Sequence, residues 1–120
     1  REIKNLVVTA GKQYIASRMV GTSANVMSHM ALGSGTTAAA AGDTALQSEL
    51  GRVALTTGTA AGAVVTYTAT FGAGTATGAV TEAGVLNAAS AGTLLCRTVF
   101  AVVNKGADDA MAITWAITAS

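Results

Sequence analysis

The sequence is short of charge. Only 11% of its 120 residues are Asp, Glu, Lys or Arg, whereas an ordinary soluble domain has about 25%. The formal net charge is +1 and aromatic residues make up 4%, so Ala, Thr, Gly and Ser must cover most of the surface. Interspersed charge normally keeps a monomer soluble. The composition therefore favours a subunit that its neighbours cover, and the alternative is a secreted all-β domain with a threonine-rich surface.

The near-neutral charge also bears on partners. Nucleic-acid-binding domains usually carry a basic patch, but the seven Lys and Arg residues are scattered along the chain. No apolar run reaches the roughly 18 residues of a membrane helix. The N-terminal stretch lacks the apolar core of a signal peptide. We therefore expect neither a nucleic-acid partner nor a membrane partner.

Cysteine and histidine are almost absent, which limits the possible metal sites. A single Cys excludes an intrachain disulfide. His29 and Cys96 lie far apart in the sequence and supply at most half of a four-ligand zinc site. Asp108 and Asp109 adjoin in a polar turn, but calcium needs six to eight oxygen ligands. We expect no metal and no cofactor.

Catalytic patterns are also missing. Cys96 shares a strand face with Leu94 and Phe100, where a free Cys behaves as a small hydrophobe rather than as an activated nucleophile. The loops "GSGTTA" and "GAGTATG" lack the Lys-Ser/Thr ending of a phosphate-binding loop, and turn formation explains them better. The sequence predicts a protein that is not an enzyme, with no catalytic residues and no small-molecule substrate.

What the chain does have is two-residue alternation, which is typical of β-strands. It is clearest over 65–71 and 111–118, and strands are also predicted over 2–8, 26–32, 79–86 (broken near Gly84) and 93–103. Residues 52–71 predict two strands around 58–62, and 104–109 a turn. Helices are predicted over 10–20, capped by Thr9, and over 44–51, where Thr44 and Gln47 have the spacing of a capping box.

These elements predict a mainly β chain, an antiparallel β-sandwich with a jelly-roll-like arrangement and a short N-terminal helical portion. No linker or charge block divides the sequence. We expect one domain over 1–120, with a strand and helix segment at about 1–21.

Three charged residues are candidate interface residues. Glu82 and Arg97 lie on predicted neighbouring strands, where they can pair across the sheet or reach a partner subunit. Arg52 is the third candidate. The residues alone do not decide between these alternatives.

The order of segments resembles small virion structural proteins of tailed bacteriophages. The shared pattern is a Gly-Thr loop in "MALGSGTTAAAAGDTAL", the "QSELGRVAL" turn, "VTYTATF", "TEAG" and the "KGADD" turn before a strand with Trp115. It covers about residues 27–119 and contains no active-site motif.

The resemblance implies a non-enzymatic virion component, assembled in the host cytoplasm and located in the virion. One type is a capsid decoration or cement protein, which binds the major capsid protein or other virion subunits and stabilises their contacts. The other is a tail-fibre, baseplate or adaptor component involved in host attachment. The compact chain favours the capsid role, and its composition favours a homo-oligomer.

Overall fold

The structure is a computed structural model that describes residues 6–21 and 25–118. Its elements are, in chain order, β1 (Leu6–Val7), α1 (Thr9–Met19), β2 (His29–Gly33), β3 (Glu49–Ala54), β4 (Thr57–Ala61), β5 (Val64–Phe71), β6 (Gly78–Leu86), β7 (Leu94–Lys105) and β8 (Met111–Thr118). The predicted N-terminal strand is present only as β1, because Val8 is already the capping position of α1 and residues 2–5 of the predicted range lie outside the described residues.

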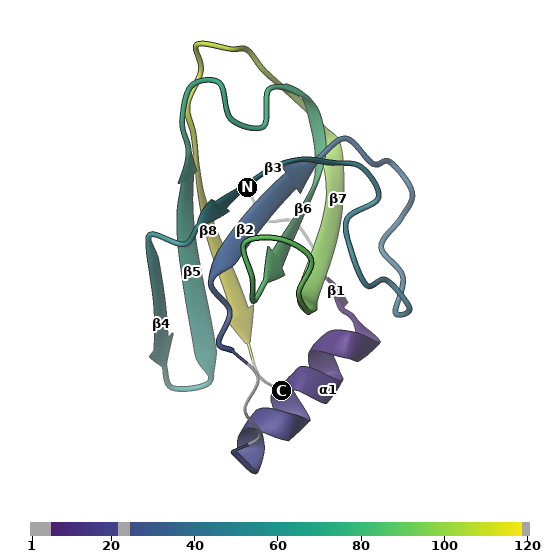
Figure 1. The fold of residues 1–120 in the computed structure, drawn as a ribbon, viewed down its shortest axis with the longest axis vertical. Coiled ribbons are helices and arrows are strands. Elements are labelled where there is room, and N and C mark those ends of the chain that lie inside the picture. The colour runs from purple at the N-terminus through teal and green to yellow at the C-terminus, as the bar shows by residue number, and fades with distance from the viewer. Residues whose placement is uncertain (1–5, 22–24, 119–120) are drawn as a thin grey trace.

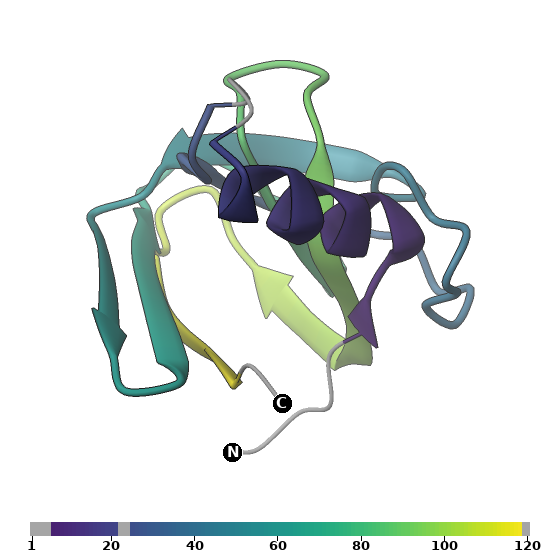
Figure 2. The ribbon, with the colours of Figure 1, turned by 90° about the horizontal axis from the view of Figure 1, so that it is seen from below.

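The strands form two antiparallel sheets. One sheet has the order β1-β7-β6-β2-β3 and the other the order β4-β5-β8. Figure 1 and Figure 2 show the three-stranded sheet on one side of the molecule, facing the larger sheet. The predicted mainly β, antiparallel fold with one short helix near the N-terminus is confirmed. One sheet has five strands and the other has three. The feature that this fold shares with a jelly roll is therefore its two facing antiparallel sheets.

The larger of two buried apolar clusters lies between the two sheets, and the smaller one contains Val8, Ala31, Leu46, Leu86 and Leu94. In the larger cluster, Phe71 of β5 and Trp115 of β8 meet Met30 and Leu32 of β2, and all four side chains are buried. The predicted alternation on β8 is confirmed, because every second side chain packs on the core while the residues between them are exposed. Apolar burial of this kind contributes about 25 cal/mol per Å² to folding.

Helix α1 packs against β7 at its first turn. Gly11 is buried there, and a Cβ on this residue would lie 2.1 Å from the Leu95 carbonyl oxygen. The helix near 10–20 is confirmed, but Thr9 is not its cap. The capping position is Val8, and the Thr9 N–H donates to the Ala41 carbonyl at 2.8 Å. Gly21, with a φ of +75°, follows the helix end.

The predicted helix over 44–51 is wrong. Residues 44–48 form bends that lead into β3. The reason is that the carboxylate of Glu82 accepts hydrogen bonds from the N–H groups that a helix would use. The N–H groups of Gln47 and Ser48 donate to it at 2.9 and 2.7 Å. A capping-box pattern cannot form a helix whose N–H groups are already bonded to another strand.

Two strand predictions also need correction. Residues 52–71 lie on three strands rather than two, with β4 and β5 joined at Gly62 (φ +57°). Strand β6 continues through Gly84, which pairs with Arg97, and its pairing with β7 shifts register only between Val85 and Leu86 and between Val80 and Glu82. A Cβ on Gly84 would lie 2.8 Å from Leu46 and 2.9 Å from Leu94, so this glycine allows close side-chain packing rather than a break.

The Gly11 contact gives a stability test. We expect Gly11→Ala to lower the free energy of unfolding by about 1–3 kcal/mol, because the added methyl group forces α1 away from β7. This loss would occur although Ala is the better helix former by about 1 kcal/mol. Urea denaturation measures it. Gly42→Ala is the control, since nothing lies within 4 Å of a Cβ on Gly42. Equal stabilities of the two variants would contradict the prediction.

Candidate functional site

The most concentrated polar arrangement surrounds the carboxylate of Glu82. This side chain is fully buried on β6. Its Oε2 accepts hydrogen bonds from the backbone N–H groups of Gly35 at 2.8 Å and Ser48 at 2.7 Å. Its Oε1 accepts from the N–H of Gln47 and from Nε of Arg97, both at 2.9 Å. Four donors therefore satisfy one buried charge, as a buried carboxylate requires.

Arg97 extends this arrangement from the neighbouring strand β7. Its side chain is 2% exposed. Besides Glu82, its guanidinium donates from Nη1 to Asp43 Oδ2 and from Nη2 to the Thr37 carbonyl, both at 3.0 Å. The guanidinium thus links a sheet carboxylate to the loop over residues 34–48 on two sides. We call Glu82, Arg97 and Asp43 the buried charge triad, in which Glu82 and Arg97 are buried and Asp43 keeps 25% of its side chain exposed.

The loop closes over the buried charge triad through further polar contacts. Gln47 Oε1 accepts from the Thr37 N–H at 3.0 Å, and Gln47 Nε2 donates to Thr37 Oγ1 at 2.8 Å. Thr81 of β6 donates its hydroxyl to the Gly35 carbonyl at 2.7 Å. A Cβ on Gly35 would lie 2.5 Å from Glu82 Oε2, so only glycine lets the backbone approach the carboxylate this closely.

The electrostatics of the site favour the charged form of Glu82. Burial alone raises a carboxyl pKa, but hydrogen bonds from the Ser48 and Gln47 backbone, Arg97 and the Gly35 backbone outweigh it and hold the pKa of Glu82 below its ordinary value. Among the described residues, every buried side-chain nitrogen and oxygen has a hydrogen-bond partner. The triad is a satisfied structural network.

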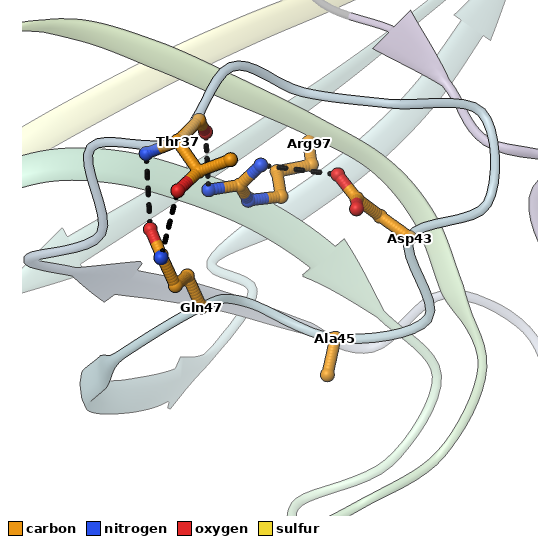
Figure 3. A pocket seen from close by; sticks show the side chains of 5 residues that line it. All are labelled: Thr37, Asp43, Ala45, Gln47 and Arg97. Carbon is orange, nitrogen blue, oxygen red and sulfur yellow. Dashed lines mark hydrogen bonds and ion pairs between the residues drawn. The ribbon is translucent and has the colours of Figure 1, made fainter.

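A shallow hollow of about 190 Å³ lies beside the triad. It is lined by Thr37, Asp43, Ala45, Gln47 and Arg97. Figure 3 shows that the polar groups on its wall bond to one another rather than point into the space. Arg97 reaches Asp43 and Thr37, and Gln47 closes back on Thr37. The polar groups that line the hollow are therefore already hydrogen-bonded to one another, which disfavours binding of a charged ligand.

The two interface candidates on β6 and β7 are placed clearly. Cross-strand pairing of Glu82 and Arg97, one of the two alternatives, is confirmed by their 2.9 Å ion pair. The other alternative, contact with a partner subunit, does not fit, because the chain itself encloses both side chains. The sequence reasoning missed Asp43 as the third charge. Its position after a run of alanines gives no signal of a contact with residue 97.

Arg52 lies in a second network on β3. It donates from Nε and Nη2 to the two carboxylate oxygens of Glu49, at 3.0 and 2.7 Å. Its Nη1 also donates to the carbonyls of Ala88 and Ala91, both at 2.9 Å. Arg52 therefore holds the loop between β6 and β7 against β3, and its role at an interface stays a prediction.

The residues considered for metal binding and catalysis lie apart. The described residues contain no group of three or more His, Cys, Asp or Glu side chains placed to hold a metal. His29 Nδ1 shares a hydrogen bond with Ser28 Oγ at 2.7 Å. Cys96 is fully buried, and burial raises the pKa of its thiol to about 12, which disfavours the nucleophilic thiolate.

The charged residues of the turn after β7 also bond to backbone groups within the chain. Lys105 is 3% exposed, and its Nζ donates to the carbonyls of Gly72 at 2.9 Å and Asp109 at 2.7 Å. The Asp109 carboxylate accepts from the Gly106 N–H at 2.8 Å. This confirms the predicted turn, and it ties the β7–β8 connection to the end of β5.

The other notable surface is the outer face of the three-stranded sheet. Strands β4, β5 and β8 contain no Asp, Glu, Lys, Arg or His. The strand register aligns Thr57 with Thr68 and Thr114, and Thr59 with Thr66. We call this surface the Thr/Ala face, and its members are Thr57, Thr59, Ala61, Val64, Thr66, Thr68, Thr70, Ala112, Thr114, Ala116 and Thr118.

The triad can be tested by neutralising its carboxylate. We expect Glu82→Gln to lower the free energy of unfolding by about 3–5 kcal/mol, because it leaves Arg97 buried without its main partner. The matched control is Glu49→Gln, which removes the more exposed partner of Arg52 and should cost about 0–1 kcal/mol. Urea denaturation of both variants measures the difference. Losses of similar size would show that burial of the triad carries no special energy.

The lowered pKa of Glu82 also predicts a pH dependence. The pKa is lower in the folded state than in the unfolded state, so the unfolded chain binds more protons in acid. The stabilisation is fully present above the ordinary glutamate pKa of about 4.3 and is lost as pH falls through the folded value. We expect Glu82→Gln to flatten the acid limb of the unfolding free energy plotted against pH. An unchanged slope, parallel to that of Glu49→Gln, would refute this assignment.

No helix in the described part of the chain is long and apolar enough to span a membrane. No protein-family model, curated protein or solved structure matches the chain.

Proposed function

We propose that this chain is a non-enzymatic structural subunit of a phage virion, which binds the capsid surface and stabilises contacts between neighbouring major capsid subunits. The observation that carries the proposal is the Thr/Ala face, a sheet surface without a single charged residue in a protein already poor in charge. Burying Ala loses no side-chain entropy, whereas ordering a Lys or Arg side chain loses up to about 2 kcal/mol. Such a face suits contact with other subunits.

The distribution of the few charges supports the same proposal. Glu82, Arg97 and Lys105 are all buried, and they fix loops to the sheets within this chain. Charges that could keep a free monomer soluble are thus partly withdrawn from the surface. A sandwich with an uncharged face can act as cement by binding the assembled shell better than free subunits, which stabilises the shell by mass action.

Repetition would amplify weak contacts of this kind. A shell presents the same neighbours many times, and linked contacts gain from a high effective concentration. A face of small side chains does not need a deep pocket to contribute under these conditions. We infer that the assembly is a phage virion from the resemblance of the sequence to small virion proteins of tailed phages.

Charge placed on the Thr/Ala face tests the proposal. We expect Thr59→Glu with Thr70→Glu, both at exposed positions, to reduce co-sedimentation with full phage heads at least tenfold, because a buried unpaired carboxylate costs more than 1.4 kcal/mol. Circular dichroism and urea denaturation check that the sheet remains folded. The control is Ala38→Glu, in the exposed loop that Figure 1 and Figure 2 place away from the three-stranded sheet.

The location of the chain in the particle decides between the two virion roles. The capsid role expects the chain in purified full heads, in a copy number related to that of the major capsid protein. Its absence from heads combined with retention in isolated tails would overturn that role. This second outcome would favour the tail-fibre, baseplate or adaptor alternative.

A further inference from the structure

We propose that β8 is a dimerisation edge and that its partner is β8 of a second copy, paired antiparallel about a two-fold axis. The two copies would then share one continuous six-stranded sheet. This inference goes beyond the proposed function, because it concerns contact between copies of this chain in solution and needs no capsid. It stands or falls independently of where the chain sits in a particle.

The first observation is an open edge. Strand β8 pairs with β5 over its full length, from Met111 to Thr118, and in the described chain no strand pairs with its other side. Figure 2 shows β8 as the last strand of the three-stranded sheet. Alternate residues of an antiparallel strand turn their N–H and C=O groups to opposite sides. Half of the backbone groups of β8 therefore face an edge that can accept another strand.

The second observation is that β8 lacks the features that normally protect an edge. It contains no charged residue, no proline and no register shift over eight residues. The other edges differ in this respect. Strand β1 has two residues, and β3 carries Glu49 and Arg52. Beyond the two residues that β1 covers, β7 is also an edge, and it has a register shift opposite residues 80–82. Strand β4 is shorter and includes Gly58. Charge, short length and bulges all discourage edge pairing.

The third observation is that β8 is self-complementary. When Thr114 lies opposite its own symmetry mate, Ile113 lies opposite Trp115 on the inner face, and Ala112 lies opposite Ala116 on the outer face. Pairs of an aromatic with a β-branched side chain are favourable across strands, and no like charges oppose one another. A shift by a single residue would place inner-face side chains on the outer face, so the register has to move in steps of two.

This register also avoids crowding. The next permitted register would place Trp115 directly opposite its own symmetry mate. This side chain is only 7% exposed and already belongs to the core cluster with Phe71 and Met30. In the register centred on Thr114, Trp115 of each copy instead lies opposite Ile113 of the other copy. An isologous contact of this kind closes at two copies, whereas pairing of β8 with β4 of another copy would continue without limit.

Cysteine cross-linking tests the pairing residue by residue. We expect Thr114→Cys to form a disulfide-linked dimer under mild oxidation, because directly opposite Cβ atoms lie about 4.5–5.5 Å apart, close to disulfide geometry. The native Cys96 is fully buried and does not compete. The control is Thr118→Cys on the same exposed face, whose symmetry mate would lie eight residues away along the strand, or about 27 Å.

A mixture of two variants checks the register. Ala112→Cys and Ala116→Cys should each remain unlinked alone, but should cross-link when mixed. Linking of Thr114→Cys with Ala116→Cys in place of the Thr114→Cys homodimer would overturn the proposed register. Linking of Thr114→Cys no faster than Thr118→Cys would overturn the pairing itself.

Charge reversal provides a test that needs no new covalent bond. The wild-type chain should sediment as a dimer of twice 11.7 kDa. Thr114→Lys and Thr114→Glu should each sediment as monomers, because like charges then oppose one another, and their mixture should restore the dimer. Thr70→Lys, exposed on the adjacent β5, should leave the dimer intact. A wild-type monomer, or an open polymer, would overturn the proposal.

Discussion

The rest of the structure depends on one buried carboxylate. Glu82 cannot stay ionised in the interior without compensation, and this chain compensates it with an arginine from the next strand and three backbone N–H groups from a loop. Because those N–H groups come from residues 35, 47 and 48, the carboxylate fixes both ends of the loop before β3. The path into β3 thus follows from satisfying a charge rather than from local helix or strand preference.

Local sequence patterns predicted well what burial alone decides. The alternation on β8 identified inward and outward residues correctly, because one face of the strand meets the core and the other meets solvent. On β5 the same contrast is visible at the end of the strand, where Ala69 and Phe71 are buried and Thr70 is exposed, while Val64–Thr68 are all half-buried. The position of Cys96 in the core and the turn near Asp109 also followed from residue type. The predicted common face of Cys96 and Leu94 is wrong, because a register shift between Val85 and Leu86 places Leu94 in a separate buried cluster. Helix α1 was found from its helix-forming residues and the glycine after it.

Local patterns failed where a distant group decides the conformation. Thr44 and Gln47 have the spacing of a helix start, but Glu82, 35 residues further along than Gln47, takes the N–H that a helix would use. Gly84 looks like a break in a strand, yet it makes room for Leu46 and Leu94. The pairing of Glu82 with Arg97 was one of two open alternatives, and Asp43 was missed. In each case the deciding contact joins segments remote in sequence, which no periodicity within a segment can reveal.

The uncharged three-stranded sheet has a consequence for how contacts form. Electrostatic attraction speeds encounter between charged surfaces and weakens as salt screens it. A surface without ionisable groups gains no such acceleration and loses none in concentrated salt. Partners of the β4-β5-β8 sheet would therefore meet by diffusion alone, and the lifetime of each contact would rest on dehydration of small side chains and on backbone hydrogen bonds. Such contacts would keep their strength over a wide range of salt concentrations.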